Sequence, residues 1–329
     1  MKTKYIILAL VLLAVSISPA WAGNALRMGT AGAAELLIPV GSRGTAMGGA
    51  VVADASGVEA IYWNPAGLAK TEGTEVMFTH QPYLVDVDVN FAGVGTYIEG
   101  FGVLGVSAKI VSVGDMEETT REHPEGTGRI FSPNLAVLGL TYAKTLTANV
   151  SFGATAMFIR EDIFEVKANG MAFDVGFIYD PRWKGFSLGL AIKNYGPTMK
   201  FTGQGFQQIL EDRPFSGESR PFELPSSINM GVAYNFLNEG PNMVTATGNF
   251  RSNNFSEDYY QGGVEYVYDG KYSLRAGYNY ADQVKWIYGA SLGAGLKFSL
   301  GNTDLTVEYC WTETETFDAN QYWTLKASF

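Results

Sequence analysis

Two serine-centred motifs stand out among the residues of this 329-residue chain that could do chemistry. The stretches 185–189 and 289–293 both read Gly-x-Ser-x-Gly, around Ser187 and Ser291. A hydrolase nucleophile in this pattern sits on a strand-to-helix turn and needs a general base. Both serines instead lie inside alternating segments that predict strands, and the chain has two histidines in all. We therefore expect no catalytic residues and no enzymatic activity.

Three further patterns have weak chemical meaning. The glycine-rich stretch 100–105 matches a dinucleotide fingerprint, but no helix follows it, so the phosphate-binding mechanism fails. Asp86, Asp88 and Asn90 offer oxygen ligands for Ca²⁺, although a polar strand face entering a loop explains them better. Cys310 is the single cysteine, which excludes an intrachain disulfide and a four-cysteine metal site. We expect no cofactor and no metal.

Composition points to an exported membrane protein. Residues 1–22 combine a basic start, an apolar run and a small-x-small cleavage site, which predicts a removed signal peptide rather than a retained anchor helix. Charged residues make up only 17% of the chain, below the usual ~25%, and there are 39 glycines and 18 tyrosines. The formal net charge of −10 does not favour nucleic acid as a partner.

Alternating apolar and polar residues predict strands from residue 74 onward. In 320–329, for example, Trp323, Leu325, Ala327 and Phe329 form one face, and polar residues form most of the other. About fourteen segments of this kind are recognisable, most of them about 10 residues long, which is enough to cross a bilayer when tilted. They are 74–81, 88–98, 101–113, 132–144, 148–160, 168–180, 184–195, 226–237, 242–251, 258–269, 271–281, 286–300, 303–313 and 320–329.

The connections between these segments alternate in length. Short turns such as Asp269-Gly270 follow even-numbered strands, and the long stretches 114–131 and 196–225 follow odd-numbered ones. The prediction is an all-β fold: a fourteen-stranded antiparallel transmembrane β-barrel over 74–329 in the bacterial outer membrane. Both ends of the chain that forms the barrel would be periplasmic, with the long loops extracellular. Outer-membrane lipid and the barrel assembly machinery would be partners. A soluble β-sandwich would also alternate, but would not need so low a charge content.

Several charged side chains fall on the polar face of the predicted strands. A Lys or Arg facing lipid at mid-depth costs about 2–4 kcal/mol, so these residues must face the lumen. A charged lumen does not suit a hydrophobic channel along the whole barrel axis. It favours a barrel whose interior is plugged. The residues are Asp174, Glu265, Arg275, Lys297, Glu308 and Lys326.

Residues 23–73 do not resemble spanning strands. They are rich in Gly and Ala, which let backbones approach closely in a confined space, and 64–67 reads Asn-Pro-Ala-Gly, a turn by its own chemistry. Their apolar content argues against a disordered periplasmic arm. We predict a hatch or plug folded into the barrel. Its candidate residues are Asp54, Ser56, Tyr62, Trp63, Asn64, Pro65 and Gly67.

This segment carries a resemblance to a known family. Gly-x-Arg-Gly at 41–44, Met-Gly-Gly-Ala at 47–50 and Tyr-Trp-Asn-Pro-Ala-Gly-Leu at 62–68 resemble the N-terminal hatch of FadL-like outer-membrane proteins, and most closely the PorV/PorQ branch. The stretches 113–117 and 124–128 are similar to that branch too, and the resemblance covers essentially the whole mature chain. It implies one of two roles. PorV-like proteins of type IX secretion receive secreted proteins and hand them on at the cell surface, whereas FadL-like proteins pass fatty acids or other hydrophobic solutes.

The loop 196–225 is the main candidate for binding a partner. Long loops in compact domains are usually functional, and exposed apolar residues suggest contact with a partner or hydrophobic ligand. A loop that folds inward and caps the barrel is an equal alternative. We expect a non-enzymatic barrel that helps to secrete or display cargo proteins. The alternatives are a hatch-gated channel for hydrophobic solutes and a purely structural barrel. The loop residues are Phe201, Phe206, Leu210, Phe215 and Phe222.

Overall fold

The structure is a computed structural model, and it describes residues 27, 29–84, 86–183, 185–210, 213–281, 288–314 and 318–329. The predicted signal peptide lies outside these residues. So do the side chains of 207–216 and Tyr288.

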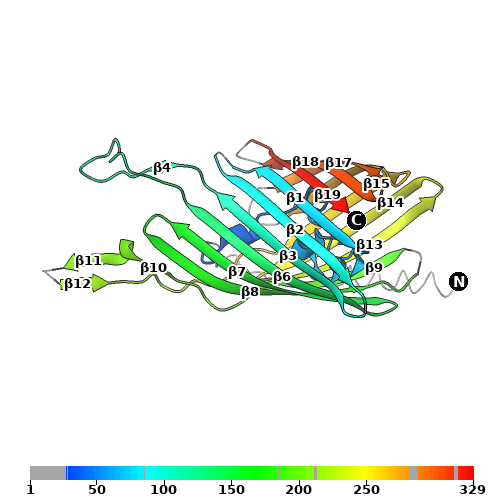
Figure 1. The fold of residues 1–329 in the computed structure, drawn as a ribbon, viewed down its shortest axis with the longest axis horizontal. Helices are drawn as coiled ribbons and strands as arrows, with labels where there is room; N and C mark the ends of the chain where they lie inside the picture. The colour runs from blue at the N-terminus through cyan, green and yellow to red at the C-terminus, as the bar shows by residue number, and fades with distance from the viewer. Residues whose placement is uncertain are drawn as a thin grey trace.

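Within the described ranges, fourteen antiparallel strands form the wall of a closed barrel (Figure 1). Strand β1 pairs with β19, so that Phe78 lies opposite Leu325, and β8 pairs with β9 to complete the ring. The fold class and the strand count predicted from the sequence are therefore confirmed. The wall strands are β1 (Thr74–Pro82), β2 (Asp88–Ile98), β3 (Gly102–Ser112), β6 (Asn134–Thr147), β7 (Val150–Ile163), β8 (Val166–Tyr179), β9 (Phe186–Tyr195), β13 (Ser227–Glu239), β14 (Asn242–Asn253), β15 (Tyr259–Tyr268), β16 (Tyr272–Tyr280), β17 (Tyr288–Leu300), β18 (Thr303–Thr314) and β19 (Asn320–Ser328).

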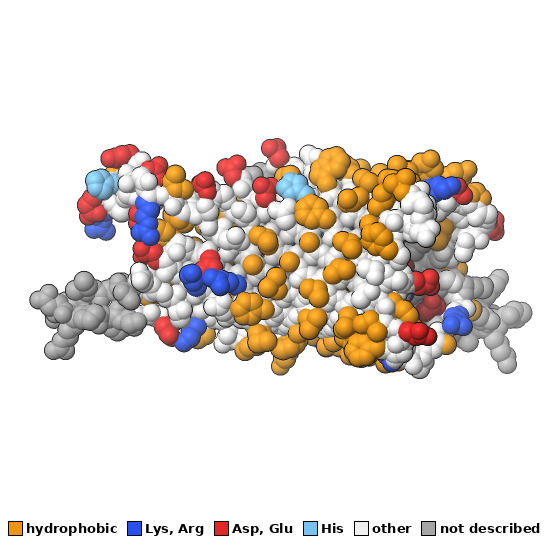
Figure 2. Space-filling model, in the orientation of Figure 1, with side chains coloured by type: hydrophobic (Ala, Val, Ile, Leu, Met, Phe, Trp, Pro, Cys, Tyr) orange, Lys and Arg blue, Asp and Glu red, His pale blue; other side chains and the backbone are white. Residues whose placement is uncertain are grey.

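The outer face of the wall is apolar. Strand β13 shows the rule: Ile228, Met230 and Val232 are exposed and alternate with buried or small residues. Figure 2 shows a broad band of apolar side chains on the face in view, with charged side chains mainly to either side of the band. A wall of this kind is solvated by lipid. None of the helices in the described ranges has the length and apolar character required to cross a bilayer.

The two ends of the barrel differ. At one end the strands are joined by short turns, and the glycines at these turns, such as Gly240 and Gly270, take positive φ values. At the other end lie the long connections with their own short strands (Figure 1). These are β4 (Met116–Glu117) paired with β5 (Ile130–Phe131), β10 (Phe201–Gly203) added to β8, the 3-10 helix η4 (Gln204–Phe206), and β11 (Gln207–Leu210) paired with β12 (Arg213–Ser216).

Residues 29–73, here called the inner segment, lie within the barrel (Figure 1). They form η2 (Ala34–Leu37), α2 (Ser42–Ala46), α3 (Ala60–Trp63) and η3 (Pro65–Lys70). Very short helices and turns are what a Gly- and Ala-rich sequence allows, because small side chains let the backbone follow the wall closely. The segment packs apolar side chains against inward-facing wall residues. One cluster joins Val58, Ile61 and Leu68 to wall strands β1, β2, β3 and β6.

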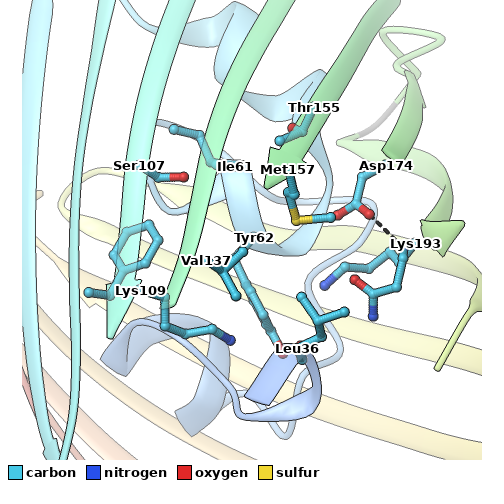
Figure 3. A pocket seen from close by; sticks show the side chains of 12 residues that line it. Leu36, Ile61, Tyr62, Ser107, Lys109, Val137, Thr155, Met157, Asp174 and Lys193 are labelled. Atoms are coloured by element: carbon cyan, nitrogen blue, oxygen red, sulfur yellow. Dashed lines mark hydrogen bonds between the residues drawn. The ribbon is translucent and has the colours of Figure 1, made fainter. Parts of the chain in front are cut away.

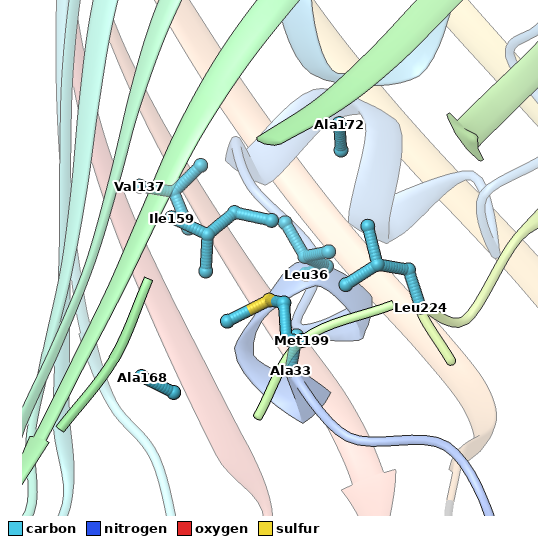
Figure 4. Packing of buried hydrophobic residues seen from close by; sticks show 8 residues of the cluster. All are labelled: Ala33, Leu36, Val137, Ile159, Ala168, Ala172, Met199 and Leu224. Atoms are coloured by element: carbon cyan, nitrogen blue, oxygen red, sulfur yellow. The ribbon is translucent and has the colours of Figure 1, made fainter. Parts of the chain in front are cut away.

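A second apolar cluster closes the long-loop end. Leu36 of η2 packs with Val137 and Ile159 of the wall and with Met199 and Leu224 of the loop 196–225 (Figure 4). Burying each large apolar side chain contributes about 1.5–3 kcal/mol. The inner segment and the base of the loop thus share one core.

Candidate functional site

A chain of ion pairs joins the inner segment to the barrel wall. Arg43 of α2 binds Asp54 within the segment and reaches Glu265 of β15 at 2.8 Å. At the other end of the chain, Lys326 of β19 lies 2.6 Å from Glu59 of the segment. Acidic and basic side chains alternate throughout, so each charge has an opposite neighbour. The order is Asp54, Arg43, Glu265, Arg275, Glu308, Lys326 and Glu59.

The middle of this chain is deeply buried. Arg275 binds Glu265 at 2.6 Å and Glu308 at 2.9 Å, and all three side chains are at most 6% exposed. Glu59 also accepts a hydrogen bond from the backbone N–H of Gly44 at 2.6 Å. Buried charges are tolerated when they are paired and hydrogen-bonded, and removing one partner costs about 3–5 kcal/mol. This chain of ion pairs therefore fixes the inner segment against β15, β16, β18 and β19.

The Asn-Pro-Ala-Gly turn fixes the segment on the opposite side. Asn64 is fully buried; its Oδ1 caps η3 by accepting from Ala66 N, and its Nδ2 donates to the carbonyls of Val52 (2.7 Å) and Phe177 (3.2 Å). Pro65 occupies the first turn of η3, where its missing N–H costs nothing. A Cβ on Gly67 would lie 2.3 Å from a backbone oxygen of Ala55. Asn64 is thus held by its hydrogen bonds, Pro65 fits the first turn of η3, and Gly67 is required by a close backbone approach.

Wall glycines make room for these contacts. A Cβ on Gly277 of β16 would lie 2.1 Å from the backbone nitrogen of Gly48, and one on Gly153 of β7 would lie 2.2 Å from the backbone of Pro65. Real Cβ atoms do not approach backbone so closely. The interior is therefore shaped to the inner segment around much of the wall.

An unusual acidic residue lies near the long-loop end. Glu35 of η2 is 2% exposed, and neither of its carboxylate oxygens has a hydrogen-bond partner among the described residues. Burial, followed by the charge of the neighbouring Glu161, raises the pKa of Glu35 to about 8. A proton on Glu35 removes the cost of burying its charge.

The stability of the inner segment should consequently fall as pH rises. Between the ordinary Glu pKa of 4.5 and the raised value of about 8, the folded state binds more protons than the unfolded state, so stability decreases across this window. Hydrogen exchange of 29–40 should be faster at pH 9 than at pH 6 after correction for intrinsic rates. Glu35→Gln should remove most of this difference. A pH-independent exchange profile in the unaltered protein would contradict the assignment.

The loop 196–225 is divided between two environments. Met199 is fully buried, and the Phe201 and Phe222 rings lie 5.5 Å apart against the cluster of Figure 4. The hairpin of β11 and β12 lies beyond them (Figure 1). Phe206 of η4 is half-buried between the two parts. The structure gives only the backbone position of Leu210 and Phe215, on the hairpin.

The remaining predicted residues are scattered. Lys297 is half-exposed and paired with Asp304 at 2.8 Å, apart from the ion-pair chain. Ser56 is exposed, and Tyr62 and Trp63 pack edge to face at 4.9 Å. Asp174 is buried in β8, where it accepts a hydrogen bond from Asn194 N at 2.6 Å.

The motifs that could have carried catalysis lie in strands. Ser187 is in β9 and Ser291 is in β17, where its hydroxyl donates to Thr312 at 3.3 Å. Asn90 binds His80 at 2.9 Å, and Cys310 is buried beside Ala46 and Tyr322. Among the described residues there is no group of three His, Cys, Asp or Glu side chains arranged to hold a metal ion.

Sequence reasoning missed several charged interior residues, among them Arg43, Glu59, Lys109 and Lys193. Arg43 and Glu59 are isolated charges in a Gly- and Ala-rich segment, so a search for counter-charges to the predicted lumen residues could have found them. Lys109 and Lys193 share the inward phase of their strands with Ser107 and Ala191. The alternation of polar and apolar residues in β3 and β9 could therefore have predicted that both lysines face the interior.

A closed barrel with a lipid-facing apolar wall and a polar, filled interior defines an outer-membrane β-barrel. Solved structures with this fold include the monoaromatic hydrocarbon channel CymD, which has a TM-score of 0.57 at 15% identity over 89% of this chain and 98% of its own. The toluene transporter TodX of Pseudomonas putida has a TM-score of 0.56 at 14% identity, over 86% of this chain and 95% of its own. The toluene transporter TbuX of Ralstonia pickettii has a TM-score of 0.55 at 16% identity, over 88% and 98%. Identities this low show a shared fold.

The sequence itself assigns the family. Residues 22–252 match the family described as type IX secretion system protein PorV, so the chain belongs to that family. The comparison with curated proteins found no match.

Proposed function

We propose that this barrel is a non-catalytic component of protein secretion that receives cargo proteins or secretion-system subunits at the outer membrane. Its membership of the PorV family supports this role. In the proposed orientation both chain ends are periplasmic and the long loops are extracellular. Outer-membrane lipid surrounds the wall, and the barrel assembly machinery inserts it.

The observation that carries the proposal is the filled interior. The inner segment is joined to β15 and β19 by ion pairs, which buried pairs within the wall extend to β16 and β18, and it is joined to β8 through Asn64. A solute crossing along the axis would have to break several buried charged contacts, each costly to break. Residues 23–73, including the candidate hatch residues, therefore act in this proposal as a permanent plug, and partners are met at the long-loop end.

The proposed contact surface is the outer part of the loop 196–225. Its base, with Phe201 and Phe222, is anchored in the apolar cluster and so provides a rigid support. The hairpin of β11 and β12 projects beyond this support and carries Leu210 and Phe215 in its sequence. Anchored aromatic residues beneath a projecting hairpin suit the binding of another protein chain.

A loop excision tests the role of the hairpin. Gly217 N donates to Phe206 O at 3.1 Å, so removal of 207–216 leaves two ends that already touch. This variant should fold and lose most co-purifying secreted proteins or translocon subunits. As a control, removal of 119–126 from the other long loop also leaves touching ends, because Thr127 N donates to Glu118 O at 2.8 Å. Equal capture by both variants would reject the hairpin as the contact surface, and a lack of partners for the unaltered protein would reject the function.

A passive channel for hydrophobic solutes is the second candidate. One observation favours it: the β8–β9 ladder is interrupted between Phe173 and Val175, next to an internal cavity that includes Asp174 and Lys193. An interrupted ladder is a place where a solute could leave sideways through the wall. Uptake of a labelled fatty acid in cells with and without the chain separates the two functions. Equal uptake would remove the channel.

A further inference from the structure

A small chamber lies between the inner segment and β3, β6, β7, β8 and β9 (Figure 3). Its volume is about 30 Å³, enough for one or two particles the size of a water molecule. Most of its surface is apolar, provided by residues such as Leu36, Ile61 and Val137. The polar atoms of Ser107 and Thr155 interrupt this lining.

Two lysines give this chamber its charge. Lys109 and Lys193 are 5% and 6% exposed, and they lie to either side of Tyr62 in Figure 3. Their ammonium nitrogens are 4.7 and 3.7 Å from the centroid of that ring. A ring face attracts a cation, but the interaction does not neutralise the charge.

The counter-charge inside the chamber is incomplete. Asp174 is the one carboxylate among its lining residues, against two ammonium groups. Lys109 donates a hydrogen bond to Ile38 O at 2.9 Å. Lys193 has no hydrogen bond or ion pair with any described residue, although its side chain is buried and borders the cavity (Figure 3).

We propose that the chamber binds a small monovalent anion of halide size next to the ammonium group of Lys193. A buried ammonium group without an anionic partner is costly, and an anion in the adjacent space supplies the missing charge. Lys109 adds a second positive charge across the Tyr62 ring, and the Ser107 hydroxyl is available as a donor. The chamber volume selects a single small ion and excludes an acyl chain or a nucleotide. The bound ion would complete the electrostatic packing of the inner segment against β9.

Bromide provides a direct test, because its position can be read from anomalous diffraction. Crystals of the full chain in detergent, soaked in sodium bromide, should show a peak within hydrogen-bond distance of Lys193 Nζ. Lys193→Met should lose this peak. Lys297→Met should retain it, because Lys297 is a half-exposed lysine paired with Asp304 outside the chamber. In solution, bromide should raise the melting temperature of the unaltered chain more than that of Lys193→Met at the same bromide concentration.

A second variant keeps the proposal open to refutation if Lys193→Met does not fold. Asp174→Asn preserves an oxygen that accepts from Asn194 N and removes the internal negative charge. It should lower the apparent dissociation constant for bromide severalfold. The proposal is overturned by an empty chamber in soaked crystals with bromide only at the surface, by a chamber peak that survives Lys193→Met, or by unchanged bromide affinity in Asp174→Asn.

Discussion

Replacing Arg43 by alanine is expected to release the inner segment from the barrel wall. Arg43 joins Asp54 of the segment to Glu265 of β15, and its side chain is 15% exposed. Loss of one partner from a buried ion pair costs about 3–5 kcal/mol, which corresponds to local opening at least about a hundredfold more frequent. Hydrogen exchange of 41–55 should accelerate by that factor, while exchange in the wall strands stays close to its original rate.

Lys297→Ala is the matched control for this experiment. Lys297 also forms an ion pair with a wall residue, Asp304, but both side chains are about 40% exposed, and such pairs contribute about 0–1 kcal/mol. Its exchange profile should match that of the unaltered chain. If Arg43→Ala leaves exchange of 41–55 unchanged, the ion-pair chain does not hold the segment.

Adding a side chain at Gly263 is the second change for which we expect a large effect. Gly263 of β15 faces the inner segment, and a Cβ there would lie 2.6 Å from Met47 O. Backbone cannot yield as a flexible side chain can, and overpacking typically costs about 1–3 kcal/mol. Gly263→Val should therefore displace α2 and make 29–73 susceptible to protease in a barrel that still resists unfolding in detergent.

The neighbouring glycine gives an unusually close control. Gly262 is on the same strand with the opposite phase, and a Cβ there meets no atom within 4 Å. Gly262→Val adds the same side chain at one residue's distance, on the outer face. Its protease pattern should be unchanged. Equal cleavage in both variants would mean that valine weakens β15 itself rather than the fit of the inner segment.

The barrel was predictable because the membrane imposes a simple pattern on it. Apolar residues must face lipid and polar residues the lumen, so every strand shows a period of two. Strand β2 begins and ends at the predicted residues 88 and 98, and most of the other wall strands differ from their predicted bounds by one or two residues. The regular alternation of short and long connections fixed the count.

The interior was less accessible to sequence reasoning. Alternation predicts which face of the wall a residue lies on, but not how deeply it is buried. Lys297 and Glu308 were both predicted to face the lumen, yet Lys297 is half-exposed near the short-turn end and Glu308 is 2% exposed. It also cannot pair residues far apart in the chain, such as Lys326 and Glu59. The motif at 64–67 predicted a turn, but its hydrogen bonds to Val52 and Phe177 depend on the folded barrel.

The loop 196–225 shows a different limit. From the sequence, its aromatic residues fit an exposed binding surface and an inward-folded cap equally well. A binding surface would bury them against a partner, and a cap would bury them against the barrel. The structure places Phe201 and Phe222 against the apolar cluster and the β11–β12 hairpin beyond it. Long-range contacts such as Met199 N with Phe222 O at 2.9 Å decide this division, and no local pattern encodes them.

Single-molecule conductance in planar bilayers tests most directly whether the barrel is closed by its inner segment. We expect no stable open channel for the full chain, and a clear conductance increase once 40–70 are removed, because that deletion takes out Arg43, Asp54, Glu59 and Asn64 together. A steady conductance from the unaltered chain, equal to that of the deletion variant, would contradict the closed interior and favour a channel.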